Sequence, residues 1–418
     1  MYRRQFSVGW SSALVIVAIL TWASGAQAAS KYKLVFDFGK HGYRPHGNLA
    51  FDPNGNLYTA MQTCCGPQFD ELTDTRSGWK ESAGAGGGGG FTVANGGPVV
   101  DAAGTVYVTT SAGRFEGLTY TGGSVHQWIP GHRQLVDIYM FPVDDNTGHC
   151  MSGSDGCDPE AGVILDQAGN VYGTTYAGGT ADCGTVFELS PNGKGGWTET
   201  VLYSFQGTAD GQGPRSALTL DFAGNLYGTT YYGGNGVGTV FELSPNGSGG
   251  WTEAVLYAFQ GVPDGADPSS SLVFDAVGNL YGTTGGGGRS GRGTVFELSP
   301  VAGGGWTETV LYSFQGSPDG AGPVSSLTLG DAGSLYGTTI SGGGGTACTG
   351  GCGTVFKLTP NSNGGWNESL LHTFNNRSGG QNPSSGLIFD KKGNLYGTTA
   401  KGGIYGKAGG GVMFEITP

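Results

Sequence analysis

The chain has 418 residues, and 85 of them are glycine, about one residue in five. With 18 prolines and no glycine triplet period it is not collagen-like, and with 37% hydrophobic and 12% charged residues it is not a disordered chain. The formal charge of 20 − 32 = −12 makes nucleic acid a poor partner. Many glycines and few helix-forming residues predict an all-β fold.

The first thirty residues have the pattern of an export signal. Arg3 and Arg4 precede an apolar run over residues 13–23, and a stretch of small residues follows it. We therefore predict a signal peptide over residues 1–28, with cleavage after Ala29 as the alternative. The protein is then secreted, whether extracellular, periplasmic or at the cell surface, by the general or the twin-arginine route. The apolar run is too short to span a bilayer, so we expect no membrane span after cleavage.

Beyond the signal, the chain repeats itself. The string GNLYGTT, or a near copy, occurs seven times, and its tyrosines are Tyr58, Tyr107, Tyr172, Tyr227, Tyr281, Tyr336 and Tyr396. Two more strings follow in most units: GTVFELSP, as at Gly184–Pro191, and WTETVLYSF, as at Trp197–Phe205. A period of about 55 residues indicates a solenoid, a propeller or an array.

Each unit contains four short strands. In the fourth unit they are Ser216–Asp221, Asn225–Thr230, Thr239–Ser244 and Thr252–Phe259. The last of these is apolar on both faces, as expected of a sheet packed between two other sheets. The seventh unit lacks its fourth strand, and Lys31–Gly39 has the pattern of the missing one. We predict a seven-bladed β-propeller of four-stranded blades over residues 29–418, a single domain and a monomer, with its ring closed by the N-terminal strand.

These three strings resemble the GloVer tandem repeat of secreted bacterial choice-of-anchor proteins. The resemblance covers nearly all of the mature chain and is most specific in units three to seven. It implies export and a propeller fold, and it transfers neither an activity nor a catalytic residue. The D-x-x-G-N-x-Y pattern is also similar to NHL-type propellers, a group that contains binders and enzymes.

We expect any ligand on the face that carries the variable, glycine-rich loops. Tyrosine offers a flat apolar ring with a polar tip, and arginine offers forked donors, which suits polar or sugar-like ligands. The repeated aspartates of the D-G-x-x-P segments suit turns better than calcium, because each unit supplies one carboxylate. The candidate ligand-binding residues are Tyr176, Tyr231, Tyr232, Arg289, Arg292, Tyr405, Asp210, Asp264 and Asp319. The repeated tryptophans, such as Trp251, hold one register and are expected to pack between blades.

All seven cysteines lie in the variable loops. In an exported protein they predict disulfides, and the short spacings favour Cys150–Cys157 and Cys348–Cys352. The other three stay open: Cys64 and Cys65 pair with each other and leave Cys183 free, or Cys65 pairs with Cys183. The sequence has no C-x-x-C pair, no cysteine–histidine cluster and no metal-ligand spacing among its six histidines. We therefore expect no metal and no cofactor.

Two function classes fit this sequence. The first is a non-catalytic binding or scaffold module whose partner is an extracellular glycan or protein. It is favoured because the repeats carry structure and no acid–base pair is visible. The alternative is an extracellular lyase or hydrolase that acts on a glycan at the mouth of the central channel. Two carboxylates, or a histidine with a tyrosine, converging in the channel would favour the enzyme.

Overall fold

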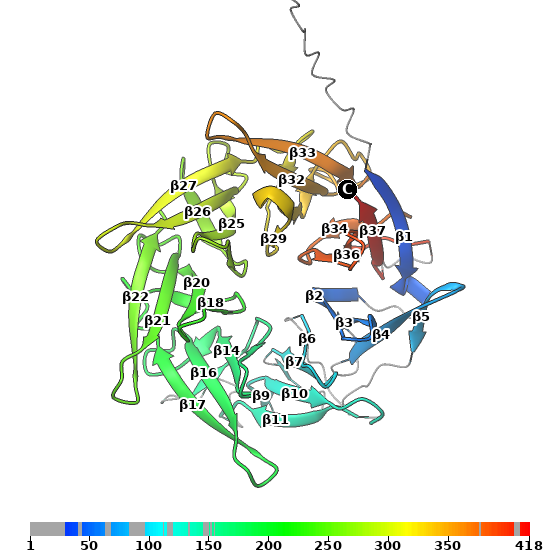
Figure 1. The fold of residues 1–418 in the computed structure, drawn as a ribbon. Helices are drawn as coiled ribbons and strands as arrows, with labels where there is room; N and C mark the ends of the chain where they lie inside the picture. Colours follow the sequence, from blue (N-terminus) through cyan, green and yellow to red (C-terminus); the bar gives the residue numbers. More distant parts are fainter. Residues whose placement is uncertain are drawn as a thin grey trace, which may run out of the picture.

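The ring has seven blades. The computed structural model describes residues 30–418 except 41–43, 63–67, 83–96, 112, 115–119, 133, 145–149, 151–152, 154, 376–377 and 405–409. Seven antiparallel sheets surround a central axis (Figure 1). The predicted signal peptide, Cys64, Cys65 and Tyr405 lie outside the described residues. Among the described residues, no helix is long and apolar enough to cross a membrane.

The strands of each blade run outward from the axis in chain order, except that the outermost strand of blade 7 is the N-terminal one. Blade 1 has β2 (Arg44–Phe51), β3 (Leu57–Gln62), β4 (Gln68–Thr75) and β5 (Gly78–Ser82). Blade 2 has β6 (Val99–Val100), β7 (Val106–Thr110), β10 (Ser124–Trp128) and β11 (Val136–Met140), with the small pair β8 (Gly113–Arg114) and β9 (Tyr120–Thr121). Blade 3 has β13 (Ile164–Leu165), β14 (Val171–Thr175), β16 (Thr185–Pro191) and β17 (Trp197–Ser204), with the small pair β12 (Gly156–Cys157) and β15 (Ala177–Gly178). Blade 4 has β18 (Gln212–Pro214), β19 (Thr219–Leu220), β20 (Leu226–Tyr232), β21 (Thr239–Pro245) and β22 (Trp251–Ala258).

The last three blades repeat this order. Blade 5 has β23 (Gly265–Pro268), β24 (Val273–Phe274), β25 (Leu280–Gly287), β26 (Thr294–Pro300) and β27 (Trp306–Ser313). Blade 6 has β29 (Thr328–Leu329), η2 (Asp331–Gly333), β30 (Leu335–Thr339), β32 (Thr354–Pro360) and β33 (Trp366–Thr373), with the small pair β28 (Gly320–Ala321) and β31 (Ser341–Gly342). Blade 7 has β34 (Gln381–Pro383), β35 (Ile388–Phe389), β36 (Leu395–Lys401), β37 (Val412–Thr417) and β1 (Lys31–Asp37), which is followed by η1 (Phe38–Lys40).

The N-terminal strand closes the ring, as predicted. β1 pairs antiparallel with β37 from Lys31 opposite Thr417 to Asp37 opposite Val412. Figure 1 shows the two strands side by side, although they come from opposite ends of the chain. Strand pairing leaves β37 without an open edge, and an open edge would be a template for association with other chains.

The tight D-x-x-G-N turns account for the first repeated string. In blade 4, Oδ1 of Asp221 accepts hydrogen bonds from the backbone N–H groups of Ala223 and Asn225, both at 2.8 Å. Its Oδ2 accepts from Tyr227 Oη at 3.2 Å. Gly224 has φ +88°, a conformation that side chains strongly disfavour. The string therefore encodes a turn and its anchor.

Buried threonines and aromatic pairs account for the rest of the repeat. Thr230 and Thr239 share a hydrogen bond of 2.7 Å between their hydroxyls inside blade 4, where both are buried. Each repeated tryptophan packs near a tyrosine of the preceding blade. The ring pairs are Trp197 on Tyr107, Trp306 on Tyr227, Trp366 on Tyr281 and Trp79 on Tyr396, while Trp251 joins the core cluster of Tyr172. Packing between blades, as expected for these tryptophans, is what the structure shows.

Candidate functional site

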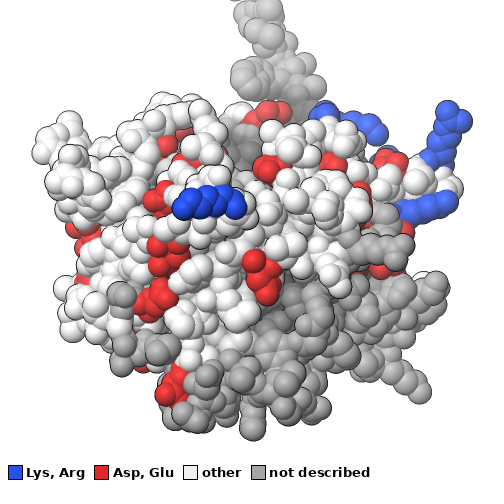
Figure 2. Space-filling model, turned by 90° about the horizontal axis from the view of Figure 1, so that it is seen from below, with Lys and Arg blue, Asp and Glu red and all other residues white. Residues whose placement is uncertain are grey.

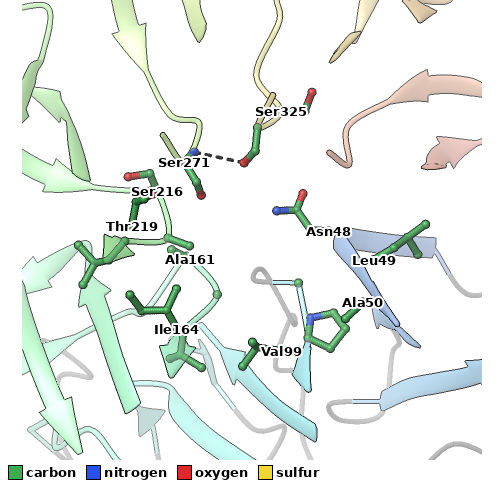
Figure 3. A pocket seen from close by; sticks show the side chains of 18 of the residues that line it. Asn48, Leu49, Ala50, Val99, Ala161, Ile164, Ser216, Thr219, Ser271 and Ser325 are labelled. Atoms are coloured by element: carbon green, nitrogen blue, oxygen red, sulfur yellow. Dashed lines mark hydrogen bonds between the residues drawn. The ribbon is translucent and has the colours of Figure 1, made fainter. Parts of the chain in front are cut away.

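The innermost segments of all seven blades line a central channel. Its cavity has a volume of about 510 Å³ and is walled mainly by small side chains, several of which Figure 3 labels. Asn48 reaches across to blade 7, where its Oδ1 accepts a hydrogen bond from the backbone N–H of Gly386 at 2.7 Å. A Cβ added at Gly97 would lie 2.5 Å from the backbone nitrogen of Asn48, so glycine is required there. The channel is thus narrow and closely packed at blade 1.

Most polar groups in the channel serve the fold. Oγ of Ser216 accepts the N–H of Thr229 at 3.1 Å, and the backbone carbonyl of Ser216 accepts the hydroxyl of Thr174 in the previous blade at 3.2 Å. The N–H of Ser271 donates to Oγ of Ser326 at 3.3 Å, the dashed line in Figure 3. Buried polar groups that already have partners are poor candidates for ligand chemistry.

The charged side chains of the channel lining, Glu160 and Arg215, lie at the mouth of the channel on the loop-rich face. Nε of Arg215 in blade 4 lies 2.8 Å from Oε2 of Glu160 in blade 3. The two side chains are 32% and 24% exposed, so solvent still reaches the ion pair. The guanidinium carbon of Arg215 also lies 4.5 Å from the ring centroid of Tyr176 and 4.6 Å from that of Tyr231. We call Glu160, Tyr176, Arg215 and Tyr231 the mouth cluster.

Local backbone geometry positions the mouth cluster. Pro214 pairs with Thr230 across two antiparallel strands of blade 4, so Arg215 and Tyr231 are diagonal neighbours, one residue beyond this pair in opposite directions. A Cβ added at Gly213 would lie 2.6 Å from the ring of Tyr176, and Gly213 has φ +64°. Glycine at this position therefore lets the Tyr176 ring approach the strand that carries Arg215.

The mouth cluster lies in an acidic setting. Burial raises the pKa of Glu160; the positive charge of Arg215 opposes this rise, and the carboxylate of Asp158 adds to it. Burial also raises the pKa of Tyr231, with Asp267 as the next cause. Among the described residues that line the channel cavity, Glu160 is the one carboxylate. It is held by Arg215, and the described lining places no second carboxylate across the channel from it.

The predicted ligand-binding residues fall into separate places. Tyr176 and Tyr231 come together through Arg215 at the mouth cluster. Tyr232 packs edge-on against Tyr231 with 4.7 Å between ring centroids and is 41% exposed. Arg289 and Arg292 are exposed on the long loop of blade 5, and Arg289 lines a groove on the rim instead of the mouth.

The predicted aspartates Asp210, Asp264 and Asp319 lie between blades, where they are hydrogen-bonded. Each accepts hydrogen bonds from a tyrosine hydroxyl and a backbone N–H, as Asp210 does from Tyr203 Oη at 3.0 Å and from the N–H of Gln206 at 2.7 Å. The other tyrosine bonds are Tyr139 to Asp155 (2.9 Å), Tyr257 to Asp264 (3.0 Å) and Tyr312 to Asp319 (3.2 Å).

A glutamate of the next blade faces each of these aspartates. The pairs are Glu199 with Asp155, Glu253 with Asp210, Glu308 with Asp264, and Glu368 with Asp319. Burial, and then the neighbouring aspartate, raises the pKa of each glutamate to about 7. The Oε1 atom of each glutamate is buried and has no hydrogen-bond partner among the described residues. We call these four sets the carboxyl pairs.

One cavity on the rim of the ring contains a carboxyl pair. It lies between the outer strands β22 and β27 and has a volume of about 730 Å³. Its walls include Tyr257, Asp264, Arg289 and Glu308. Two predicted ligand-binding residues, Asp264 and Arg289, therefore meet here. We call this cavity the rim groove.

A third polar arrangement lies inside blade 2. Thr110 Oγ1 is 2.9 Å from Nε2 of His126, and Nδ1 of His126 is 2.5 Å from Asp137. The order hydroxyl, imidazole, carboxylate is that of a nucleophile with its base. Thr110 is only 1% exposed and His126 only 6%, so the hydroxyl is closed to a substrate. This set fills the interior of a blade whose repeat is degenerate.

Sequence reasoning missed Arg215 and Glu160. The two residues occupy the same place in successive units, directly after the proline that ends each inter-blade segment. The described residues at this place differ from blade to blade: Glu160, Arg215, Ser269, Val324 and Ser384. Variation at one position of an otherwise regular repeat was the signal that could have identified them.

Two disulfides stabilise the loop-rich face, and both were predicted. Cys150 pairs with Cys157 across a Cα–Cα distance of 5.8 Å, and Cys348 pairs with Cys352 across 5.1 Å. Cys183 is buried without a disulfide partner among the described residues. In the described part of the chain, no group of three or more histidine, cysteine, aspartate or glutamate side chains is arranged to hold a metal ion.

Fold and sites together define a seven-bladed β-propeller with a polar channel mouth and acidic inter-blade contacts. Residues 94–349, more than half of the chain, match the Gloeobacter/Verrucomicrobia repeat, and the protein belongs to this family. A comparison with curated proteins finds no match.

Several solved structures share the fold. Virginiamycin B lyase from Staphylococcus aureus has a TM-score of 0.54 at 13% identity, covering 93% of this chain and 99% of its own. YCF48 from Cyanidioschyzon merolae also has a TM-score of 0.54 at 13% identity, covering 94% and 99%. The extracellular domain of BT4673 from B. thetaiotaomicron has a TM-score of 0.53 at 15% identity, covering 93% of this chain and 42% of that one. At these identities the likeness concerns the fold alone.

Proposed function

We propose that this protein is an exported, monomeric, non-catalytic binding module whose mouth cluster takes the end of a neutral oligosaccharide. The contact of Arg215 with two tyrosine rings and a carboxylate carries the proposal. Saccharides present hydroxyls with apolar C–H faces, and such a ligand is matched by donors, acceptors and aromatic rings in one concave place.

The charges favour a neutral saccharide over an acidic one. Arg215 and Glu160 balance each other, and Asp158 and Asp267 lie close by. The chain as a whole carries a formal charge of −12, and acidic side chains outnumber basic ones on the side of the ring that Figure 2 shows. A carboxylated or sulfated sugar would meet this negative potential at the mouth.

Binding without chemistry agrees with the described channel lining, where Glu160 has no second carboxylate on the other side of the channel. A glycan hydrolase needs an acid and a second carboxylate on opposite sides of the reacting bond. The described channel lining offers Glu160 alone, in an ion pair with Arg215. Export is supported by the two disulfides, because such bonds persist in oxidising compartments.

A glycan array probed with the mature protein tests this function. Neutral oligosaccharides should give the signals, and Arg215→Ala or Tyr176→Ala should remove them. Arg292→Ala is the matched control, because Arg292 is an exposed arginine of a neighbouring loop outside the mouth cluster. Equal binding by Arg215→Ala, or signals from acidic glycans alone, would contradict the proposal.

A glycan-active enzyme is the second candidate, favoured by one observation. The pKa of Glu160 is raised by burial, and a general acid needs this property. Product analysis after incubation with the bound glycan separates the two functions: new reducing ends or unsaturated products that Glu160→Gln abolishes would establish the enzyme.

A further inference from the structure

The rim groove differs from the other inter-blade contacts in what stands around its carboxyl pair. Val262, which is 66% exposed, and Pro263 form an apolar lip. Arg289 belongs to the loop of blade 5 that follows β25, and it lines the same cavity. Pro263 recurs as Pro318 in the next unit, whereas Val262 and Arg289 are not repeated, so the fold alone does not explain these two residues.

Arg289 is available for a ligand, whereas its counterparts are engaged within the protein. Thr180, at the corresponding place in blade 3, accepts a hydrogen bond from Nε2 of Gln206 at 3.2 Å. Asn235, at that place in blade 4, donates to the backbone carbonyl of Phe259 at 3.2 Å. Arg289 is exposed and donates no hydrogen bond to a described residue.

The carboxyl pair supplies complementary hydrogen bonding. Oδ2 of Asp264 accepts from Tyr257 Oη at 3.0 Å and from the N–H of Gln260 at 2.9 Å, which fixes its carboxylate. Glu308 stands opposite, and burial with the nearby Asp264 raises its pKa to about 7. Below about pH 7 the groove therefore holds a protonated Glu308 that can donate beside the Asp264 carboxylate, which accepts.

The rim groove has little net charge, but its lining still offers several hydrogen-bond donors and acceptors. A protonated Glu308 is neutral, and Arg289 offsets Asp264. Gln260 and Gln315 add amide donors and acceptors to the lining. A cavity of about 730 Å³ lies within the general size range of ligand-binding sites in proteins.

We propose that the rim groove between β22 and β27 is a second, independent binding site for a neutral polysaccharide chain. The chain lies across the rim, with its hydroxyls on Arg289, Asp264 and Glu308 and an apolar ring face on the Val262–Pro263 lip. The groove is open along the outside of the ring, so it takes the side of a long polymer and not only its end. This site does not depend on ligand binding at the mouth cluster.

Affinity electrophoresis of the mature protein tests the proposal. The protein migrates through native gels that each contain xylan, galactomannan, mixed-linkage β-glucan, soluble starch or polygalacturonate. Retardation by at least one neutral polymer is expected, and Arg289→Ala should raise the dissociation constant about tenfold, as for loss of one charge-assisted hydrogen bond. Asn235→Ala, the matched change in blade 4, should leave the constant unchanged.

The outcomes separate the two sites. Arg215→Ala should leave retardation intact, because a mouth-bound chain end contributes little to the capture of a long polymer by the rim. Glu308→Gln keeps the shape and a donor and should retain binding, while Asp264→Asn with Arg289→Ala should abolish it. No retardation by any neutral polymer, retardation by polygalacturonate alone, or unchanged binding by Arg289→Ala overturns the rim site. Loss of binding in Arg215→Ala with full binding in Arg289→Ala assigns the polymer to the mouth cluster instead.

Discussion

Tyr32 stacks on His372 with 3.9 Å between the ring centroids and 12° between the ring planes. Tyr32 stands on β1 where other blades have the glutamate of the carboxyl pair, and His372 stands where they have the tyrosine. Tyr32 Oη donates to the backbone carbonyl of Gly379 at 2.7 Å, at the place of the aspartate. The interface that closes the ring therefore replaces an acidic contact with an aromatic one. Burial lowers the pKa of His372 to about 4, so this contact is neutral at physiological pH.

Removing the closing contact should destabilise the whole ring. Tyr32→Ala should lower the free energy of unfolding by about 3 kcal/mol, because it deletes a largely buried aromatic ring and its hydrogen bond. Lys33→Ala is the control, since its ion pair with Glu415 at 3.1 Å is exposed and should contribute less than ~1 kcal/mol. Deletion of residues 31–39 should expose the edge of β37 and cause self-association, seen by light scattering. A monomeric deletion variant with an unchanged melting temperature would disprove this role of β1.

The carboxyl pairs should make stability fall as the pH rises. The folded-state pKa of Glu199, Glu253, Glu308 and Glu368 is about 7, above the ordinary value of 4.5. The folded protein thus binds more protons than the unfolded chain between these values. The stability from these groups is fully present below pH 4.5 and is lost as the pH rises through about 7. His372, with its pKa lowered to about 4, decreases stability as the pH falls below 6.5, but it is a single group opposed by four glutamates.

Thermal unfolding between pH 5 and pH 8 measures this dependence. The melting temperature should decrease over this range in the native protein. A variant with all four glutamates changed to glutamine should show a much flatter profile, because an amide stays neutral. The same decrease in the variant would show that other groups are responsible.

Tryptophan and tyrosine substitutions should separate folding from binding. Trp251→Ala should cost about 3 kcal/mol of stability, because Trp251 packs into the core cluster between blades 3 and 4. Tyr231→Ala, and its double variant with Tyr232→Ala, should weaken oligosaccharide binding while shifting the melting temperature only slightly. Chemical denaturation and the glycan array give the two readouts. A folded Trp251→Ala protein that fails to bind would place the ligand on the opposite face.

The cysteines should show three different states. Peptide mapping under non-reducing conditions should recover Cys150 linked to Cys157 and Cys348 linked to Cys352. Cys183 should resist alkylation until the protein unfolds, because burial raises the pKa of its thiol and only the thiolate reacts. We expect Cys64 and Cys65 to form a vicinal disulfide. A peptide that links Cys65 to Cys183 would reject both of these last expectations.

The sequence predicts the fold well because the repeat encodes it locally. The D-x-x-G-N turn, the threonine pair and the inter-blade tryptophan each recur at the same place in most of the seven units, so the copies support one interpretation. The closing strand follows from the count of strands. Arg215 and Glu160 escape such reasoning, because they are 55 residues apart and meet only through the packing of two blades.

The carboxyl pairs could not be predicted from the sequence for a related reason. Glu253 reads as an exposed residue of an outer strand, and Asp210 reads as a turn residue. Only the packing of neighbouring blades brings the two residues together, and this proximity adds to burial in raising the pKa of Glu253. Such pairs depend on how neighbouring blades pack in the ring, and the sequence of one repeat unit does not predict this packing.

The pairing of β1 with β37 has a consequence for the order of biogenesis. A chain synthesised from its N-terminus delivers β1 first and its hydrogen-bonding partner β37 last, after six blades have been made. Each of those blades can form from its own consecutive strands as it appears. β1 has no partner strand until synthesis reaches β37, so the seventh blade and the complete ring assemble in one late step. The interval between the synthesis of β1 and that of β37 therefore sets how long the nascent chain exposes an unpaired strand that could associate with other chains.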